Sequence, residues 1–489
     1  MAALFYGRAD LALSHYDARA HLVVARRILD SLLPGWQQIG AVWLPLPHVL
    51  NMLPVQIDAW YRSGASAIAI SVMSMALAVW ALARTIARTT GSVVGGMTGA
   101  VLLMSNPNVL YLQSTPMTEP LLFGTALLAV SLTIDWLDRD PSGRAAPAGL
   151  ALTGAAMTRY EAWPITAAII ALSGLTMVRR GRSVRQALIG CLRLAVCPGV
   201  AVLLFVVNSR WTVGEWFVSS GFFVAENKAL GNGLVAWDQV REGAYQLSGT
   251  ALIWSAYVAA AVVVAVFACS RSRASIVLLL APVASAALPW YAYLHGHPLR
   301  VRYSLPLIAA SAVLIAVAVS LLPRRLRLPI AIIVIALTTI QAHPLDRTAA
   351  LIVESQRDAP NKIGRQAVTN YLVRHRDGTP IMMSMGSLAH YMHDLSAYGF
   401  HIHDFLHEGN GELWVYAFRL GPRGFVKWVV VEEKAEGGDA LFHRAQRDPH
   451  FFDGFTRVAE GGGVALYEVQ GSGFTARTLN HEPRIEGAR

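Results

Sequence analysis

Ten apolar segments lie between residues 64 and 342, and they limit the fold more than any other feature of this chain; the fourth and the last are shorter than a full span needs. A transmembrane helix needs about 20 predominantly apolar residues. Only 15% of the chain is charged, against about 25% in ordinary soluble domains. The sequence therefore predicts a multi-pass α-helical membrane protein with about ten spans. The segments are 64–83, 92–110, 119–136, 146–157, 162–178, 187–207, 251–269, 274–293, 303–322 and 328–341.

Arginine-rich loops alternate with other loops between these segments. Because positively charged loops remain in the cytoplasm, we expect the other loops and the C-terminal region to face the outside of a bacterial plasma membrane. The net charge of +10 is explained by this topology and does not indicate a nucleic-acid partner. The arginine-rich loops are "RTIAR" (84–88), "DRDPSGR" (138–144), "RRGRSVR" (179–185), "RSR" (271–273) and "PRRLR" (323–327).

Changes of composition divide the chain into four predicted parts. They are an outer first loop with an interfacial amphipathic helix (1–63), a transmembrane domain (64–342), a small α/β domain on the outer face (343–475) and a disordered tail (476–489). The pattern of the third part predicts an amphipathic helix at 363–376 and strands at 380–385, 427–433 and 464–469.

A histidine-rich stretch lies within the predicted outer domain. Histidine is a common ligand of zinc, but the spacing matches no standard zinc pattern. We therefore expect surface and turn histidines and assign no metal ligand, while a divalent metal cofactor stays open. The stretch contains His390, His393, His401, His403 and His407, together with Asp394 and Asp404.

A charged helix is predicted at 14–31, ahead of all the apolar segments. Asp17 and His21 share one face of it, whereas Arg19 and Arg26 share another. A helix with apolar residues on one side and arginine on the other is typical of the membrane interface, where arginine can bind lipid phosphates. Asp17 stands at the start of this helix, and it is either an N-cap or a catalytic carboxylate.

Two further carboxylates lie where apolar segments enter the membrane. Glu119 opens one segment, and it is either part of a helix start or a functional group, because charge at that depth is costly. The sequence "MTRYEAW" places Arg159, Tyr160 and Glu161 between two apolar segments. Arg159 and Glu161 either form a simple ion pair in this turn or belong to a binding site.

These motifs, in this order, resemble the GT-C class of membrane glycosyltransferases. The resemblance is to bacterial relatives of glycosyltransferase family 39, a group that includes protein O-mannosyltransferases and lipid A aminoarabinose transferases. It covers roughly residues 14–322 and rests on "YDARAHLVVARRILDSLLPG…VWLPLPH", "TEPLL", "TRYEAWP" and "RVRYSLPL".

The resemblance implies a helical membrane fold with its active site at the outer face and a sugar donor linked to a polyprenyl phosphate. It also implies that an acidic residue of the first external loop is the catalytic base, and Asp17 occupies that place. Two features depart from the family pattern. Ala18 stands where many members have a second acidic residue, and residues 1–13 are too short and too polar for the span that usually precedes this loop.

We therefore expect inverting transfer of a hexosyl or pentosyl group to a hydroxyl of a lipid, glycan or protein, with Asp17 accepting the proton. Three arginines are expected to stabilise the leaving phosphate, with snorkelling to the interface as their alternative role; they are Arg159, Arg300 and Arg302. The other expected substrate contacts are Arg19, His21, Glu119, Tyr160 and Glu161. The outer loop at 214–233 is expected either to cover the site or to lie at the interface.

The main alternative is a transporter or flippase of a polyprenyl lipid or glycolipid. Such proteins usually show internal repeats or charged residues in the middle of their spans, and this sequence shows neither. A structural membrane protein whose outer domain binds a partner is the third interpretation. The carboxylates on the predicted outer side favour an enzyme over it.

Overall fold

A computed structural model describes residues 1–218 and 223–471, apart from the side chain of Glu436. The chain forms two compact units, which we call unit 1 and unit 2. Unit 1 contains Met1–Ala18, Gly40–Pro54 and Ser63–Gln356, and unit 2 contains Arg19–Ile39, Val55–Arg62 and the chain from Arg357 onward. The predicted tail at 476–489 and part of the predicted loop at 214–233 lie outside the described residues.

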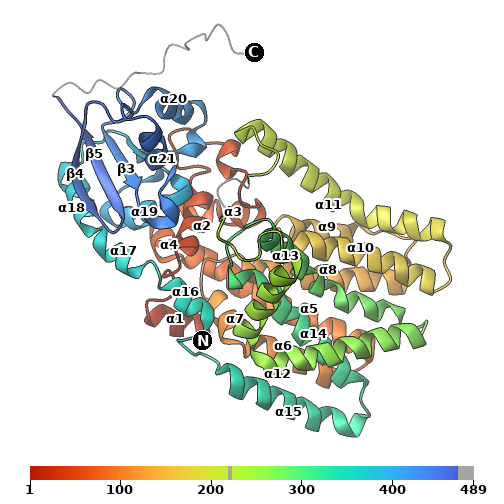
Figure 1. The fold of residues 1–489 in the computed structure, drawn as a ribbon. Helices are drawn as coiled ribbons and strands as arrows, with labels where there is room; N and C mark the ends of the chain where they lie inside the picture. Colours follow the sequence, from red (N-terminus) through yellow and green to blue (C-terminus); the bar gives the residue numbers. More distant parts are fainter. Residues whose placement is uncertain (219–222, 472–489) are drawn as a thin grey trace. The chain divides into compact units, whose positions relative to one another are not determined.

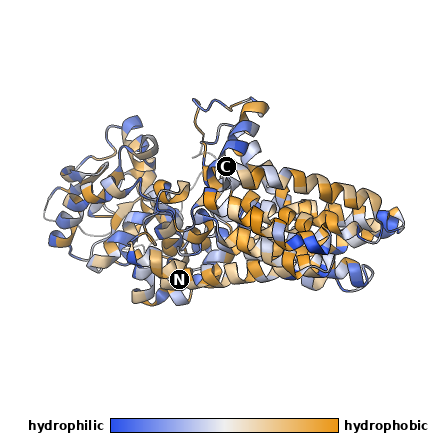
Figure 2. Cartoon of the chain, turned by 90° about the horizontal axis from the view of Figure 1, so that it is seen from below, coloured by the Kyte–Doolittle hydropathy of each residue, from blue (hydrophilic) through white to orange (hydrophobic). Residues whose placement is uncertain are grey.

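Unit 1 is a helical membrane domain. Within the described residues, eight helical segments are long and apolar enough to cross a membrane, and two apolar helices are shorter. Each of the ten predicted segments overlaps one of them, so the multi-pass prediction is confirmed. The long segments are α5 (Ala65–Thr90), α8 (Glu119–Arg139), α10 (Ala162–Arg179), α11 (Val184–Val213), α12 (Gly233–Cys269), η4 with α13 (Ala274–Ala286 and Ala287–Leu294), η5 with α14 (Val301–Ser304 and Pro306–Leu321) and α15 (Arg324–Ala342), and the shorter ones are α6 (Val93–Met104) and α9 (Ala146–Ala156) (Figure 1). Hydrophobic residues dominate these helices in Figure 2.

Several predicted boundaries differ from those of the structure, including the end of the second segment and the start of the seventh. The segment predicted at 92–110 ends its first helix at Met104, because Asn106 caps a separate helix, α7 (Pro107–Leu112). The Asn106 side chain accepts backbone N–H groups at 2.9 and 3.3 Å, as an N-cap does. Helix α12 begins at Gly233, well before the predicted residue 251, and it bends at Gly249 (φ 75°).

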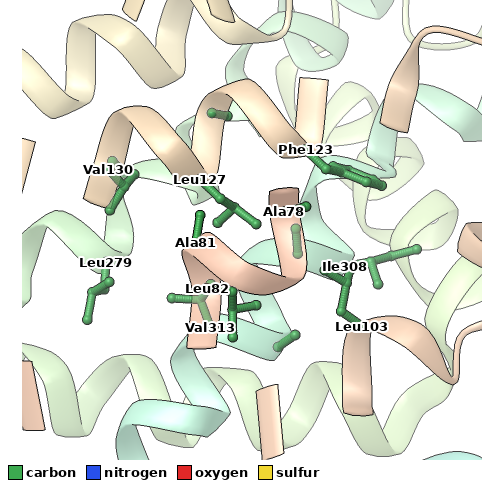
Figure 3. Close-up of a cluster of buried hydrophobic side chains, with 14 of the residues drawn as sticks. Ala78, Ala81, Leu82, Leu103, Phe123, Leu127, Val130, Leu279, Ile308 and Val313 are labelled. Carbon is green, nitrogen blue, oxygen red and sulfur yellow. The ribbon is translucent and has the colours of Figure 1, made fainter. Parts of the chain in front are cut away.

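The core of unit 1 lies where α5 packs against α6 and α8. Figure 3 shows alanines of α5 between larger side chains such as Phe123 and Leu127. At Gly124 the two helices approach so closely that a Cβ atom would lie 2.7 Å from the carbonyl oxygen of Ser74 in α5. Small residues at such contacts let helix backbones pack tightly where lipid gives no hydrophobic driving force.

Unit 2 contains a five-stranded sheet with the order β2-β1-β3-β5-β4 (Figure 1). The first three strands in this order are parallel, and β5 runs antiparallel to both β3 and β4. The strands are β1 (Ile381–Met383), β2 (Phe405–Leu406), β3 (Trp428–Glu432), β4 (Phe455–Gly461) and β5 (Val464–Val469), and the helices after Arg357 are α17 (Ala359–Gly364), α18 (Gln366–His375), α19 (Met385–Leu395), α20 (Glu412–Leu420) and α21 (Ala440–Arg447).

The three predicted strands and the predicted amphipathic helix are confirmed by β1, β3, β5 and α18. Sequence analysis missed β2 and β4. Strand β2 has only two residues, too few to show a period of two. The side chains of β4 are only partly buried or exposed, so its composition lacks the apolar run of a core strand.

The charged helix predicted at 14–31 exists as α2 (Tyr16–Arg26), which begins in unit 1 and continues into unit 2. Its two arginines pair with carboxylates of unit 2. Arg19 donates to Asp394 at 2.6 Å and to Asp358 at 2.7 Å. Arg26 pairs with two other aspartates of unit 2. Both guanidinium groups are buried, and protein carboxylates offset their charge.

Three of the five histidines predicted to lie on the surface or in turns are buried in unit 2, namely His390 and His393 of α19, and His407. Burial lowers the pKa of His390 to about 4, although Asp358 nearby acts in the opposite direction. Burial likewise lowers the pKa of His393 to about 4, and a ring nitrogen of His393 lies 3.1 Å from the backbone oxygen of Tyr61. The folded unit therefore holds both rings in the neutral form at pH values where an unfolded chain would take up protons.

We predict that Gly124→Ala lowers the stability of the protein in detergent by about 1–3 kcal/mol, because the new methyl group forces α8 away from α5. The matched control is Gly199→Ala in α11, where a Cβ would meet no atom within 4 Å. That change should leave the melting temperature unchanged or raise it, since alanine favours helix. Equal melting temperatures of the two variants would contradict the close approach of α8 to α5 at Gly124.

We also predict that unit 2 loses stability as the pH falls from 6.5 to 4. The folded-state pKa values of His390 and His393 lie below the unfolded value, so protonation favours the unfolded chain throughout this interval. The double variant His390→Gln/His393→Gln should be less stable at neutral pH, but its unfolding should depend less on pH. The exposed residue His450 provides the control, as His450→Gln should retain the wild-type pH slope in thermal melts.

Candidate active site

Asp17 lies in the first turn of α2, where the positive end of the helix stabilises a carboxylate. It forms a buried ion pair with Arg302 of η5, between Oδ2 and Nη1. The backbone N–H of Asp17 donates to Nδ1 of His15 at 3.1 Å. Asp17 is thus held by an arginine far away in the sequence, which the role of helix cap does not require.

A second buried group surrounds Arg159, which lies between α9 and α10. Arg159 Nη2 donates to Glu161 Oε1 at 2.7 Å, Arg159 Nη1 lies 3.0 Å from Glu119 Oε1, and the same Nη1 donates to Thr118 Oγ1 at 3.0 Å. Burial by itself would lower the pKa of Arg159, but the charges of Glu119 and Glu161 raise it above its ordinary value. Arg159 is therefore a fixed cation.

Electrostatic interactions connect the two groups. The positive charge of Arg302 interacts with Asp17 and also with Glu119 and Arg159. We call Asp17, Glu119, Arg159, Glu161 and Arg302 the arginine–carboxylate cluster. It contains one more carboxylate than arginines, and all five residues belong to unit 1.

The two glutamates of the cluster differ in hydrogen bonding. Glu161 accepts three hydrogen bonds from Arg159 at 2.7–3.2 Å. Glu119 is only 1% exposed, and neither of its carboxylate oxygens accepts a hydrogen bond from the described residues. A buried acceptor without such bonds is unfavourable by itself, so Glu119 is suited to accept hydrogen bonds from hydroxyl groups of a ligand.

A further carboxylate lies beside this cluster and was missed by sequence analysis. Glu354, in α16 (Ala350–Ser355), is buried, and His15 Nε2 lies 3.8 Å from its Oε1. Burial would raise the pKa of Glu354, but His15 and Arg302 hold it below its ordinary value. The signal that could have revealed it is one acidic side chain in the otherwise apolar run "ALIVES".

Polar loops of unit 1 fix the position of α16. Asn108 Oδ1 accepts the backbone N–H of Leu351 at 3.0 Å, and the Asn108 amide donates to the carbonyl of Leu247 at 2.9 Å. The hydroxyl of Ser14 donates to Ser355 at 2.8 Å. These bonds tie α16 to the chain that leads into α2, so Glu354 and Asp17 are held by one network.

The remaining predicted site residues have different surroundings. Tyr160 donates to the carbonyl of Val42 at 3.1 Å and packs against Trp163, which are structural contacts. The backbone carbonyl of Arg300 accepts from Tyr293 at 2.8 Å, and the charge of Arg300 acts on Glu354. Arg19 and His21 lie in the part of α2 that belongs to unit 2, and carboxylates of that unit occupy both terminal nitrogens of Arg19.

The arrangement can perform two chemical tasks. A carboxylate in a helical first turn can accept a proton, and buried arginines can stabilise a developing phosphate charge. The low-polarity surroundings strengthen both interactions relative to water. The cluster therefore fits chemistry on an anionic substrate that also carries hydroxyl groups.

No family model matches this sequence, and neither does any curated protein sequence. Among solved structures, ArnT from Cupriavidus metallidurans in the apo state, an aminoarabinose transferase of the GT-C family, aligns with 92% of this chain and 92% of its own, at 11% identity and a TM-score of 0.57. ArnT from the same organism bound to undecaprenyl phosphate aligns with 95% of this chain and 96% of its own, at 14% identity and a TM-score of 0.49. The apo structure shows that this chain has the GT-C fold, as its sequence motifs predicted.

Proposed function

We propose that this protein is a membrane glycosyltransferase that moves a sugar from a polyprenyl-phosphate donor to a hydroxyl acceptor at the outer face of the bacterial plasma membrane. The observation that carries the proposal is the arginine–carboxylate cluster, which combines a candidate base with candidate phosphate ligands inside one buried site. The GT-C fold supports the same class of reaction. The arginine-rich loops support the outer location, since the site residues come from the opposite set of loops.

Asp17 is the base in this proposal. The acceptor oxygen attacks the anomeric carbon while its proton passes to the Asp17 carboxylate, and the bond from that carbon to the phosphate oxygen breaks. Attack opposite to the leaving group inverts the anomeric configuration and needs no covalent intermediate. The products are the glycosylated acceptor and the free polyprenyl phosphate.

Arg302 links donor binding to the release of this base. A carboxylate paired with arginine is a weak base, so Asp17 becomes active when Arg302 turns to another anion. The donor phosphate is such an anion, and guanidinium groups bind phosphate through two parallel hydrogen bonds. Nε of Arg302 has no hydrogen-bond partner among the described residues, so this side chain has a donor to offer. Arg159 and Arg300 add positive charge near the leaving group.

The other residues have supporting roles. Glu119 accepts hydrogen bonds from sugar hydroxyls, and Glu161 holds Arg159 in place. Arg19 is proposed to fix α2 rather than to touch the substrate, because Asp358 and Asp394 already bind its guanidinium. His21 and Tyr160 are kept as candidates for contact with the acceptor.

We predict that Asp17→Asn lowers the turnover of sugar transfer by about 10²–10⁴-fold, the usual contribution of a general base. Transfer would be measured in membranes with a panel of polyprenyl-phosphate sugars. The matched control is Asp238→Asn, which removes an exposed aspartate paired with Arg241 at 2.9 Å in the same unit, and it should keep wild-type turnover. Retained transfer by Asp17→Asn would rule out this base. If neither wild type nor Asp17→Asn transfers sugar to any acceptor, but both still transport the lipid across the membrane, the flippase interpretation would be favoured.

Substitution of the two glutamates should separate binding from stability. Glu119→Gln should raise the KM for the donor and lower the melting temperature less than Glu161→Gln does, because Glu119 pairs with Arg159 at 3.0 Å but accepts no hydrogen bond from the described residues. Glu161→Gln should lower stability by about 1.5–3 kcal/mol, because it weakens charge-assisted bonds to Arg159. Kinetics and thermal unfolding of both variants test this, and the reverse pattern would exchange the two roles.

A further inference from the structure

Unit 2 brings together three side chains that lie outside the arginine–carboxylate cluster. Asp30, which follows α2, meets His401 and His403, and one potential ligand atom from each lies within 4.8 Å of the other two. Histidine, cysteine, aspartate and glutamate side chains can bind metal ions. Among the described residues, these three form the one group of at least three such side chains whose ligand atoms lie close enough together to hold an ion. Sequence analysis considered the histidines but did not include Asp30.

Hydrogen bonds hold the turn that carries both histidines. The backbone N–H of His401 donates to Asp404 Oδ2 at 2.8 Å, and Arg376 donates to the same oxygen at 2.9 Å. The backbone N–H of His403 donates to Asp30 at 3.3 Å. The two imidazole rings stack with their centroids 5.1 Å apart and their planes 6° apart. Both rings are thereby aligned before any ion binds.

The distances between these side chains are close to those that a bound cation needs. Nδ1 of His403 lies 2.5 Å from Asp30 Oδ1, and Nδ1 of His401 lies 3.9 Å from Asp30 Oδ2. Ligand atoms of a tetrahedral zinc ion lie about 3.3 Å apart, given zinc–ligand distances of about 2.0–2.1 Å. Nδ1 of His403 therefore has to move away from Asp30 Oδ1 by less than an ångström, and His403 is exposed enough to rotate. The ligand atom of His401 lies within 4.8 Å of those of Asp30 and His403, so a small further closure completes the set.

Arg26 is the neighbour that works against a cation. Its Nε donates to Asp30 Oδ2 at 2.8 Å, and its Nη2 lies 3.4 Å from Nδ1 of His401. However, Asp58 pairs with Arg26 at 2.7 Å and offsets its charge, while Arg62 lies 3.5 Å from Asp58. Arg26 also fixes the orientation of the Asp30 carboxylate, as outer-shell partners of metal ligands do. The other carboxylate oxygen, Oδ1, faces His403.

We propose that Asp30, His401 and His403 bind a divalent transition-metal ion, with a fourth position open to water. Imidazole nitrogens with one carboxylate suit zinc, copper or nickel, whereas magnesium prefers oxygen ligands alone. The ion would join the end of α2 to the turn at His401–His403 within unit 2 and stabilise that unit. This site is separate from the proposed transfer reaction and does not depend on it.

Zinc chloride is the probe for this site. The full chain would be purified in detergent without a polyhistidine tag, dialysed against zinc and then against buffer, and its metal content and melting temperature would be measured. Wild type should retain about one zinc ion per chain and melt at a higher temperature with zinc than without it. The double variant His401→Ala/His403→Ala should lose both effects, and Asp30→Asn should weaken them.

The matched control is His450→Ala, which removes an exposed histidine that pairs with a single aspartate at 3.0 Å and should retain zinc like wild type. Wild-type zinc content in the double variant would overturn the proposal. Loss of the bound zinc when magnesium is added at the same concentration as zinc would overturn it as well. If the double variant elutes abnormally in gel filtration, His403→Gln replaces it, because the exposed site of His403 tolerates a polar side chain. Full zinc retention by His403→Gln would equally overturn the proposal.

Discussion

Burial of arginine together with more than one carboxylate is the constraint that shapes unit 1. An uncompensated charge in a low-polarity interior costs several kcal/mol, so Arg159 requires Glu119 and Glu161, and Arg302 requires Asp17. The partners come from the starts of different helices. Their pairing therefore joins α2, α8, α10 and η5 through polar contacts. Apolar packing of α5 against α6 and α8 forms the hydrophobic core of unit 1.

The same physical logic appears within unit 2 with other partners. Asp358 lies between Arg19 and Arg365, at 2.7 and 2.9 Å. These arginines outweigh the cost of burial, so the pKa of Asp358 falls to about 2. Because α2 supplies Asp17 to one unit and Arg19 to the other, a single charged helix takes part in both ionic networks. This accounts for a helix that is polar in sequence and yet buried.

The pairing that stabilises the cluster is also what the proposed chemistry would use. In the absence of substrate, Arg302 pairs with Asp17. A substrate anion that attracts Arg302 would free the carboxylate, so base activation would follow donor binding and protect the site from premature proton uptake. Glu119, which no described residue hydrogen-bonds, offers unsatisfied acceptors that a sugar hydroxyl can fill.

The sequence by itself determined the ten helical segments, three of the strands and, through its motifs, the GT-C fold. These features depend on local apolar patterns or on short motifs, which a single segment carries without its neighbours. Apart from the local pair of Arg159 and Glu161, only the tertiary structure decided which charges meet. Asp17 with Arg302, His15 with Glu354, and Asp30 with His401 and His403 are each separated by hundreds of residues, and no periodicity encodes such a pairing. The tertiary structure also gives Arg19 its two carboxylate partners, Asp358 and Asp394, which become its neighbours only when unit 2 folds.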